Sequence, residues 1–225
     1  MDLQTSDWVH IIVALFLGAC ALSVPYLVEL LKRKYFAPVF KIEFEHGYPY
    51  CHQTVYSNRQ PVYYFRFRVV NTGESQAKSC EGVLEELWLA DSAGRFIQEK
   101  NFSPVNLNWS GQFIETPTGR IPKQFIDINQ ERRVFCDIGH INHPVVTEKS
   151  VFYLEEDNKE LKFLFDINPK FYSQRDCVSP GKAKIKVAIY SQNARKHEKY
   201  FSIAWSGRWK DREEDMFKEI VIEKL

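Results

Sequence analysis

The sequence predicts a mainly β protein in which one N-terminal transmembrane helix precedes an antiparallel β-sandwich or barrel, with a short helix near the C-terminus. Three observations predict this. Residues 8–31 are almost all apolar, hydrophobicity then alternates with a period of two, and the alternating segments follow one another at short spacing. Helical patterns of roughly 10 to 15 residues, which would indicate a parallel sheet, do not separate them. Residues 1–37 therefore form an anchor, and residues 38–225 form one domain.

The apolar run has the length of a membrane-spanning helix. Trp8 and Tyr26 mark its two ends, and a helix separates them by roughly 27 Å, close to the hydrocarbon thickness of a bilayer. Amphipathic rings of this kind prefer the headgroup boundary. We therefore expect both side chains to lie at membrane interfaces.

The charges on its two flanks orient the predicted helix. Lys32, Arg33 and Lys34 follow it, whereas Asp2 and Asp7 precede it with no lysine or arginine. Because positive flanks stay inside, we expect a single-pass protein of the cell membrane with its N-terminus outside and its C-terminal domain in the cytoplasm. The basic triplet would rest against anionic headgroups, so the lipid bilayer is the first predicted partner.

Two alternatives for the N-terminus are weaker. A cleaved secretory signal needs a basic N-terminal region and a short apolar core, whereas this region is acidic and the core is long. Leu17-Gly18-Ala19-Cys20 is similar to the lipobox of bacterial lipoproteins, in which the cysteine carries lipid. The apolar run continues to Leu31, unlike a lipoprotein linker, so a spanning helix is favoured over lipidation of Cys20.

Composition excludes some partners and sets the expected state of the cysteines. The net charge is +1 and 26% of residues are charged, so no nucleic-acid partner is predicted. Four cysteines follow the apolar run, with no CxxC pair: Cys51, Cys80, Cys136 and Cys177. In a reducing cytosol we expect them to stay thiols, whereas outside the cell their even number would permit two disulfides.

The clearest alternation is at residues 40–45, 61–70, 83–89 and 182–189. In the third of these, Val83, Leu87 and Leu89 are expected to share one face. Fainter strand signals lie at 96–100, 105–109, 124–128, 134–138, 151–154 and 161–167. The last long strand is followed by a polar, basic loop at 192–199 and a return strand carrying Phe201, Ile203 and Trp205, which predicts a hairpin. Residues 211–221 have amphipathic spacing and acids in the first turn, which predicts the short C-terminal helix.

Parts of the chain resemble a known family. FRFRVVNTGESQAK (residues 65–78) and PGKAKIKVAIYSQNA (residues 180–194) resemble strands of bacterial immunoglobulin-like modules of the cell-adhesion-related, CARDB-like type. WSGRW (residues 205–209) is similar to a tail in uncharacterised single-pass bacterial membrane proteins. The resemblance implies an immunoglobulin-like β-sandwich, longer than the usual module, and it transfers no catalytic or binding residue.

No enzyme and no cofactor is predicted. The chain has no G-x-S-x-G, P-loop or dinucleotide motif. Thiolate and imidazole suit zinc, and two clusters offer three such ligands each, but neither has a recognised ligand spacing, so no metal is predicted. These clusters are His46, Cys51 and His52, and Cys136, His140 and His143.

Three candidate binding regions remain. Arg66 and Arg68, with the lysine row at 182, 184 and 186, would form a patch for phosphate or lipid headgroups, although lysines on an exposed strand also serve to block edge pairing. Residues 101–123 mix prolines with Trp109 and Phe113, which is typical of a rigid recognition loop. The hairpin tip carries Arg195 and Lys196.

These patterns favour a membrane-tethered binding or scaffolding module for a protein partner, or for self-association, at the cytoplasmic face. Tethering would raise its effective concentration for membrane partners. The first alternative is a membrane effector that senses a small anionic ligand, such as a nucleotide signal, and oligomerises. The second is an exported, lipid-anchored, adhesion-like domain.

Overall fold

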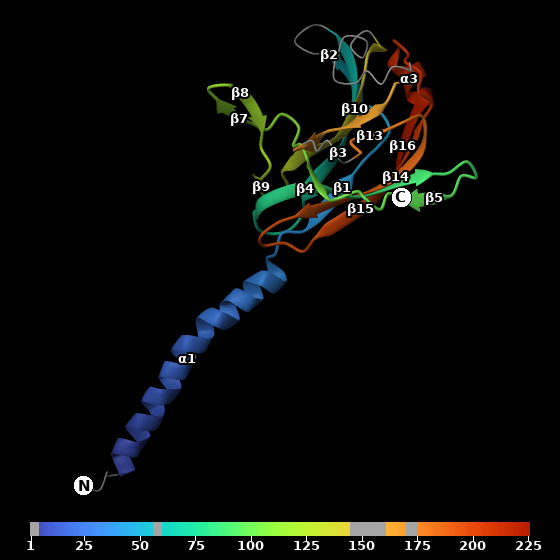
Figure 1. Ribbon diagram of the computed structural model, residues 1–225. Helices are drawn as coiled ribbons and strands as arrows, with labels where there is room; N and C mark the ends of the chain where they lie inside the picture. Colours follow the sequence, from blue (N-terminus) through green and yellow to red (C-terminus); the bar gives the residue numbers. More distant parts are fainter. Residues whose placement is uncertain (1–4, 56–59, 145–160, 170–174) are drawn as a thin grey trace.

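The computed structural model describes residues 5–55, 60–144, 161–169 and 175–225. Helix α1 (Thr5–Tyr35) leaves the β body as a single rod (Figure 1). Within it, the 20 residues Ile12–Leu31 are long and apolar enough to cross a membrane by length and composition, and none of that segment is buried. The predicted apolar helix is therefore present, and its segment Ile12–Leu31 is not covered by the body.

The body consists of two antiparallel sheets and a separate hairpin. The first, which we call the β3 sheet, has the order β1-β3-β10-β11-β13, and β2 also pairs with β3. Its strands are β1 (Phe40–Glu43), β2 (Cys51–Val55), β3 (Pro61–Asn71), β10 (Arg133–Asn142), β11 (Phe163–Phe165) and β13 (Cys177–Val178).

The second sheet, which we call the β14 sheet, has the order β12-β6-β4-β14-β15-β16, and β5 and β9 also pair with β4. Its strands are β4 (Ala77–Ala90), β5 (Phe96–Gln98), β6 (Val105–Leu107), β9 (Ile126–Ile128), β12 (Ile167–Asn168), β14 (Gly181–Tyr190), β15 (His197–Trp205) and β16 (Ile220–Lys224). The hairpin consists of β7 (Phe113–Thr116) and β8 (Gly119–Pro122). The predicted mainly β, antiparallel architecture is confirmed.

One apolar core lies between the two sheets. The alternate residues of β3 that the sequence places on one face, Tyr63, Phe65, Phe67 and Val69, are all fully buried. From the β14 sheet, Phe201 packs against Phe67 with ring centroids 5.8 Å apart. The two-residue periodicity therefore predicts the inner face of β3 correctly.

In β4 the alternation shifts by one residue, so the predicted inner face is right for Leu87 and Leu89 but wrong for Val83, which lies outside the core cluster. Leu84 and Leu87 both enter the core, and the pairing with β14 changes register between Lys186 and Val187. Glu85 is the extra residue of a β-bulge. It therefore lies on the outer face beside Glu86 instead of pointing inward.

The C-terminal helix is shorter than predicted. Helix α3 covers Glu213–Glu219, and the chain then continues into β16, which pairs with β15. Ile220 and Ile222 are buried opposite Trp205 and Ile203, because two β-branched residues at alternate positions complete the edge of the β14 sheet. The strand predicted at 151–154 lies outside the described residues.

Candidate functional site

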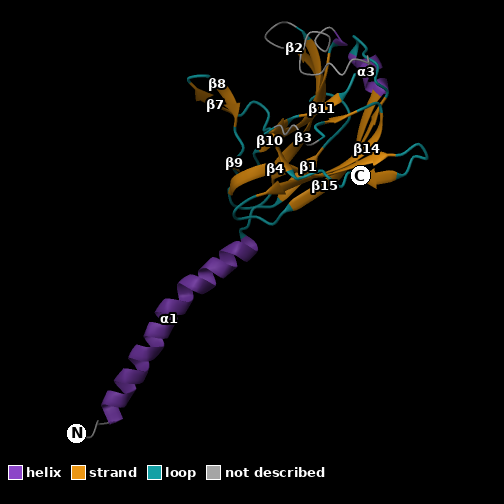
Figure 2. Ribbon diagram, viewed as in Figure 1, coloured by secondary structure: helices purple, strands orange, loops and turns teal. Residues whose placement is uncertain are grey.

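The β7–β8 hairpin stands away from both sheets (Figure 2). It carries exposed apolar side chains. Phe113, Ile114 and Ile121 are 44%, 51% and 48% exposed, and Phe125, just after the hairpin, is 52% exposed. An ion pair between Arg120 and Glu115 across the two strands is also exposed. The predicted recognition loop is therefore partly a β-hairpin that presents a group of large apolar residues to solvent.

The base of the hairpin is fixed to the core. Trp109, which the sequence suggested as a binding residue, is 1% exposed, and its indole Nε1 donates to the backbone oxygen of Gln124 at 3.3 Å. Its backbone bridges to Cys136 of β10, and Ser110 N donates to Phe135 O at 2.9 Å. Trp109 thus has no surface to offer a partner, and it positions the segment that carries Phe113.

Arg66 and Arg68 lie on the outer face of β3, where the protein itself occupies them. The Arg66 guanidinium stacks over Phe135 at 4.2 Å, and its Nε donates to Pro49 O at 3.0 Å. Arg68 forms an ion pair of 2.6 Å with Glu43, and hydrogen bonds from Lys41 and then from Arg68 lower the pKa of that carboxyl. Neither guanidinium is held open for an external anion.

The predicted patch of Arg66, Arg68 and the lysine row does not exist as one surface, because the arginines belong to the β3 sheet and the lysines to the β14 sheet. Within the row, Lys184 lies over the ring of Trp88 at 4.2 Å. Lys186 lies among carboxylates on neighbouring strands. Lys184 and Lys186 are therefore already engaged within their own sheet, whereas Lys182 is exposed.

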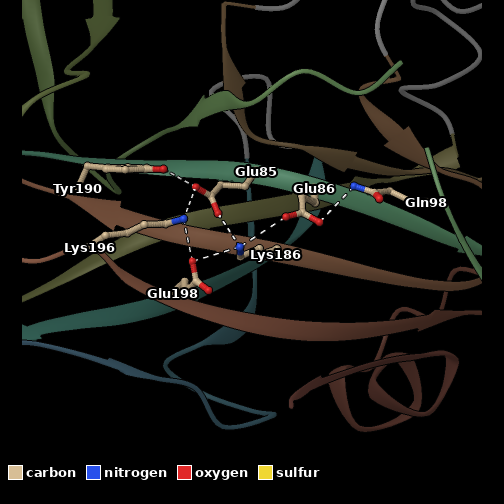
Figure 3. Close-up of polar contacts among 7 residues, drawn as sticks. All are labelled: Glu85, Glu86, Gln98, Lys186, Tyr190, Lys196 and Glu198. Carbon is tan, nitrogen blue, oxygen red and sulfur yellow. Dashed lines mark hydrogen bonds and ion pairs between the residues drawn. The ribbon is translucent and has the colours of Figure 1, made fainter. Parts of the chain in front are cut away.

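Figure 3 shows the ion-pair network around Lys186. Its Nζ is 3.3 Å from Glu85, 3.4 Å from Glu86 and 3.1 Å from Glu198. Lys196, the candidate at the hairpin tip, is 2.8 Å from Glu85 and 2.7 Å from Glu198. The bulge explains this arrangement, because it turns two successive carboxylates of β4 toward one lysine of β14.

The network shifts the pKa of its members in the directions that pairing requires. Hydrogen bonds to the two lysines and to the Tyr190 hydroxyl lower the pKa of Glu85 despite the opposing effect of burial. The pKa values of Lys186 and Lys196 are both raised, chiefly through Glu198 and Glu85. Arg195, next to Lys196, is exposed.

Close to Arg66 lies a cluster of polar side chains that the sequence analysis did not predict. Ser110 Oγ donates to Asp137, and His140 Nδ1 is 2.9 Å from Asp166 Oδ1, with both partners of that pair mostly buried. Burial, and then the charge of Asp166, raise the pKa of Asp137 to about 7. The sequence feature that could have revealed this cluster is an acid inside an apolar strand. It occurs in FCDIGHI for Asp137 and in FLFDIN for Asp166.

Neither histidine and cysteine cluster brings its three side chains together, although Cys51 Sγ lies 3.8 Å from His46 Nδ1. Cys51 points into the core whereas His52, the next residue of β2, points out, and burial raises the pKa of Cys51 to about 12. Cys136 is fully buried, and His143 packs against Trp209 with ring centroids 4.9 Å apart. Within the described ranges, no group of three or more His, Cys, Asp or Glu side chains is placed to hold a metal ion.

The connection between α1 and the body is short and tightly held. Gly73 approaches so closely that an added Cβ would lie 2.4 Å from Ala37 O and 2.5 Å from Val39 N. The buried Asn71 side chain accepts from Val39 N and Gly73 N and donates to Ser75 O and Ile128 O. The Asn-Thr-Gly turn therefore fixes the strand that follows the helix.

The predicted membrane-interface residues lie on α1. Trp8 and Tyr26 are 53% and 68% exposed. The backbone of Lys32, Arg33 and Lys34 belongs to the last turns of the helix, and their side chains lie outside the described part of the structure.

The chain matches no protein family model, and a search of curated proteins finds no sequence similar to it.

Proposed function

We propose that this chain is a single-pass membrane protein that presents an immunoglobulin-like β-sandwich at the cytoplasmic face and binds a partner protein through the β7–β8 hairpin. The observation that carries the proposal is the group of four large apolar side chains on and beside that hairpin, each 44–52% exposed. Grouped exposed apolar residues on a soluble surface are typical of protein interfaces.

The hairpin has the composition and the support of a binding element. Aromatic and aliphatic anchors contribute most of the binding energy at many interfaces. Because Trp109 and its backbone bridge to Cys136 hold the base in place, less conformational entropy is lost when a partner binds. Tethering by α1 would then confine this element near the bilayer and raise its effective concentration for partners in the membrane.

The ligand-sensing alternative has less support. It needs cations that are open to a small anion, and Arg66, Arg68 and Lys196 each have partners within the protein. Arg195 is the one candidate of that group that stays exposed with no ion pair among the described residues. A site built from a single arginine is a weak basis for recognising a nucleotide.

Site-specific photo-crosslinking on the full chain in its native membrane tests the proposal. A photoreactive residue at Ile114 or Ile121 should give an adduct of one defined mass. The matched control is Ile97 on β5, which is equally apolar and 57% exposed, and it should give none.

Each outcome has a clear meaning. A heterologous adduct at the two hairpin positions supports partner binding, and an adduct of twice the chain mass identifies a second copy as the partner. The absence of any adduct at the hairpin, or identical adducts at Ile97, would contradict the proposal, as would recovery of the intact chain in aqueous extract without detergent.

A further inference from the structure

We propose that the end of the body from which α1 leaves lies flat on the bilayer and binds anionic lipid headgroups through four side chains. These are Lys78, Arg132, Arg133 and Arg195, which we call the cationic end. The inference rests on the proposed function in one respect, namely that α1 spans a membrane. It adds a second, electrostatic contact between the body and that membrane.

Hydrogen bonds join three loops into this end of the body. Lys78 N donates to Asn193 Oδ1 at 2.9 Å, and Asn193 Nδ2 donates to Gln76 O at 2.9 Å. Gln76 Nε2 donates to Asn129 Oδ1 at 2.7 Å. The turn after β3, the turn before β10 and the β14–β15 turn are therefore one connected surface.

The same surface adjoins the exit of α1. The Asn71 side chain, which contacts Val39 N, also donates to Ser75 O and Ile128 O in these loops. In Figure 1, the β14–β15 turn and the start of β1 lie beside the upper end of α1, whereas the β7–β8 hairpin points away from it. A membrane crossed by α1 would therefore meet this end of the body first.

The charges at this end are available to a ligand. All four cations of the cationic end are exposed, and none has an ion pair among the described residues. Arg133 lines a hollow of about 480 Å³ together with Glu131 and the ion pair of Lys41 and Glu43. Arg132 lines another of about 370 Å³ together with Lys123 and Asp127. The acids in the loops of this end, Glu74 and Glu131, are exposed as well.

Apolar side chains next to the cations complete the footprint. Phe36 and Val39, between α1 and β1, are 53% and 55% exposed. An apolar side chain beside lysine and arginine is the combination that binds an interface with anionic headgroups, since the first enters the acyl boundary and the second contacts phosphate. The chemistry fits the membrane surface itself as the occupant.

Hydrogen exchange on the full chain in nanodiscs tests this inference. With phosphatidylglycerol present, amides at 72–78, 129–133 and 191–195 should exchange about fivefold more slowly than in phosphatidylcholine alone, the factor that one charge at an anionic surface supplies. High salt should remove the difference, because it screens exposed charges.

A charge-matched pair of variants assigns the effect. The quadruple variant K78E/R132E/R133E/R195E should lose the lipid-dependent slowing. The control K100E/K162E/K182E/R208E changes net charge equally at exposed cations outside these loops and should retain it. Unchanged slow exchange in β14 shows that each variant is folded.

The possible failures are distinguishable. Equal exchange in both lipid mixtures, or the same loss in the control variant, overturns the inference even when the chain is inserted in the disc. Failure of the chain to insert, or of the hairpin to crosslink, is a failure of the proposed function and is seen in a separate measurement.

Discussion

The outer face of the β14 sheet and the cationic end are both rich in positive charge, yet they differ in what surrounds that charge. Lys186 and Lys196 lie within 3.4 Å of carboxylates from β4 and β15. Arg132 and Arg133 project from the turn before β10 and from its first residue with no ion pair among the described residues. A basic residue type is therefore not evidence of a binding surface until its neighbours are known.

Strand register causes the difference. In the β14 sheet, antiparallel pairing sets Lys186 opposite Glu86, and the bulge adds Glu85 to the same face. At the cationic end, Arg132 and Arg195 lie in turns, and Arg133, the first residue of β10, is opposite the uncharged Val70. Cations that the register sets beside carboxylates are thus neutralised by the fold, whereas cations in turns or opposite uncharged residues stay available for an external surface.

The largest expected effect on the free energy of unfolding is at Asp137, on β10 of the β3 sheet. It tests whether the fold neutralises charge on this sheet as it does on the β14 sheet. Its pKa is raised to about 7 from 3.8, so the native state keeps a proton that the unfolded chain releases. This contribution to stability is complete below pH 4 and is lost as the pH rises toward 7. Between pH 5 and pH 7 its loss should lower the free energy of unfolding by about 2.3 kcal/mol, which urea unfolding in detergent would measure.

The variant Asp137→Asn isolates that effect. Because the pKa values of His52 and His197 are lowered, those residues add stability as the pH rises, so the informative quantity is the difference between wild type and variant. The variant should become more stable relative to wild type as the pH rises from 5 to 7. A constant difference across this range would show that Asp137 is not protonated in the native state.

The second largest expected effect on the free energy of unfolding is at Asn71. Hydrogen bonds of uncharged groups, rather than ion pairs, hold the cationic end together. Asn71→Ala removes four hydrogen bonds and leaves buried backbone groups without partners. We expect a loss of about 2 kcal/mol in the free energy of unfolding. The matched control Asn129→Ala, at an exposed amide of the same end, should change it by less than about 0.5 kcal/mol.

Glu85→Gln tests the ion-pair network directly. It keeps the shape of the side chain but removes the charge shared by Lys186 and Lys196, whose remaining partners are Glu86 and Glu198. The loss should be about 1 to 2 kcal/mol, since the Glu85 carboxylate is mostly buried. Glu115→Gln, in the exposed pair with Arg120, is the control and should cost less than about 0.5 kcal/mol.

Much of the fold could be predicted from the sequence because a core between two sheets imposes alternation on every long strand. Phe65 and Phe67 of β3 show this. The bulge was not predicted because the adjacent carboxylates of Glu85 and Glu86 also fit a solvated strand edge or turn, and nothing in their spacing marks an extra residue. β16 was missed because the spacing of Met216, Phe217 and Ile220 also fits a helix, while a strand of five residues offers few alternations.

The surfaces were harder to predict than the strands. The composition of residues 101–123 indicated a structured loop, but no pattern in it shows that Trp109 turns inward while Phe113 stays outside. Ion pairs are equally hard to predict from the sequence. Lys196 and Arg195 are neighbours in the chain, and only the strands that lie beside them differ. Both outcomes depend on contacts between segments distant in the chain.

The smallest expected effect is the sharpest test of the comparison. Arg132→Ala with Arg133→Ala should change the free energy of unfolding in detergent by less than about 0.5 kcal/mol, since exposed side chains without ion partners contribute little to folding. Urea unfolding monitored by tryptophan fluorescence measures this. If the loss instead equalled that of Glu85→Gln, both arginines would be structural. The distinction between cations neutralised by carboxylates and cations available to an external surface would then fail. If removing Arg132 and Arg133 leaves the free energy of unfolding unchanged, their charges are not needed for folding and remain available to bind a membrane.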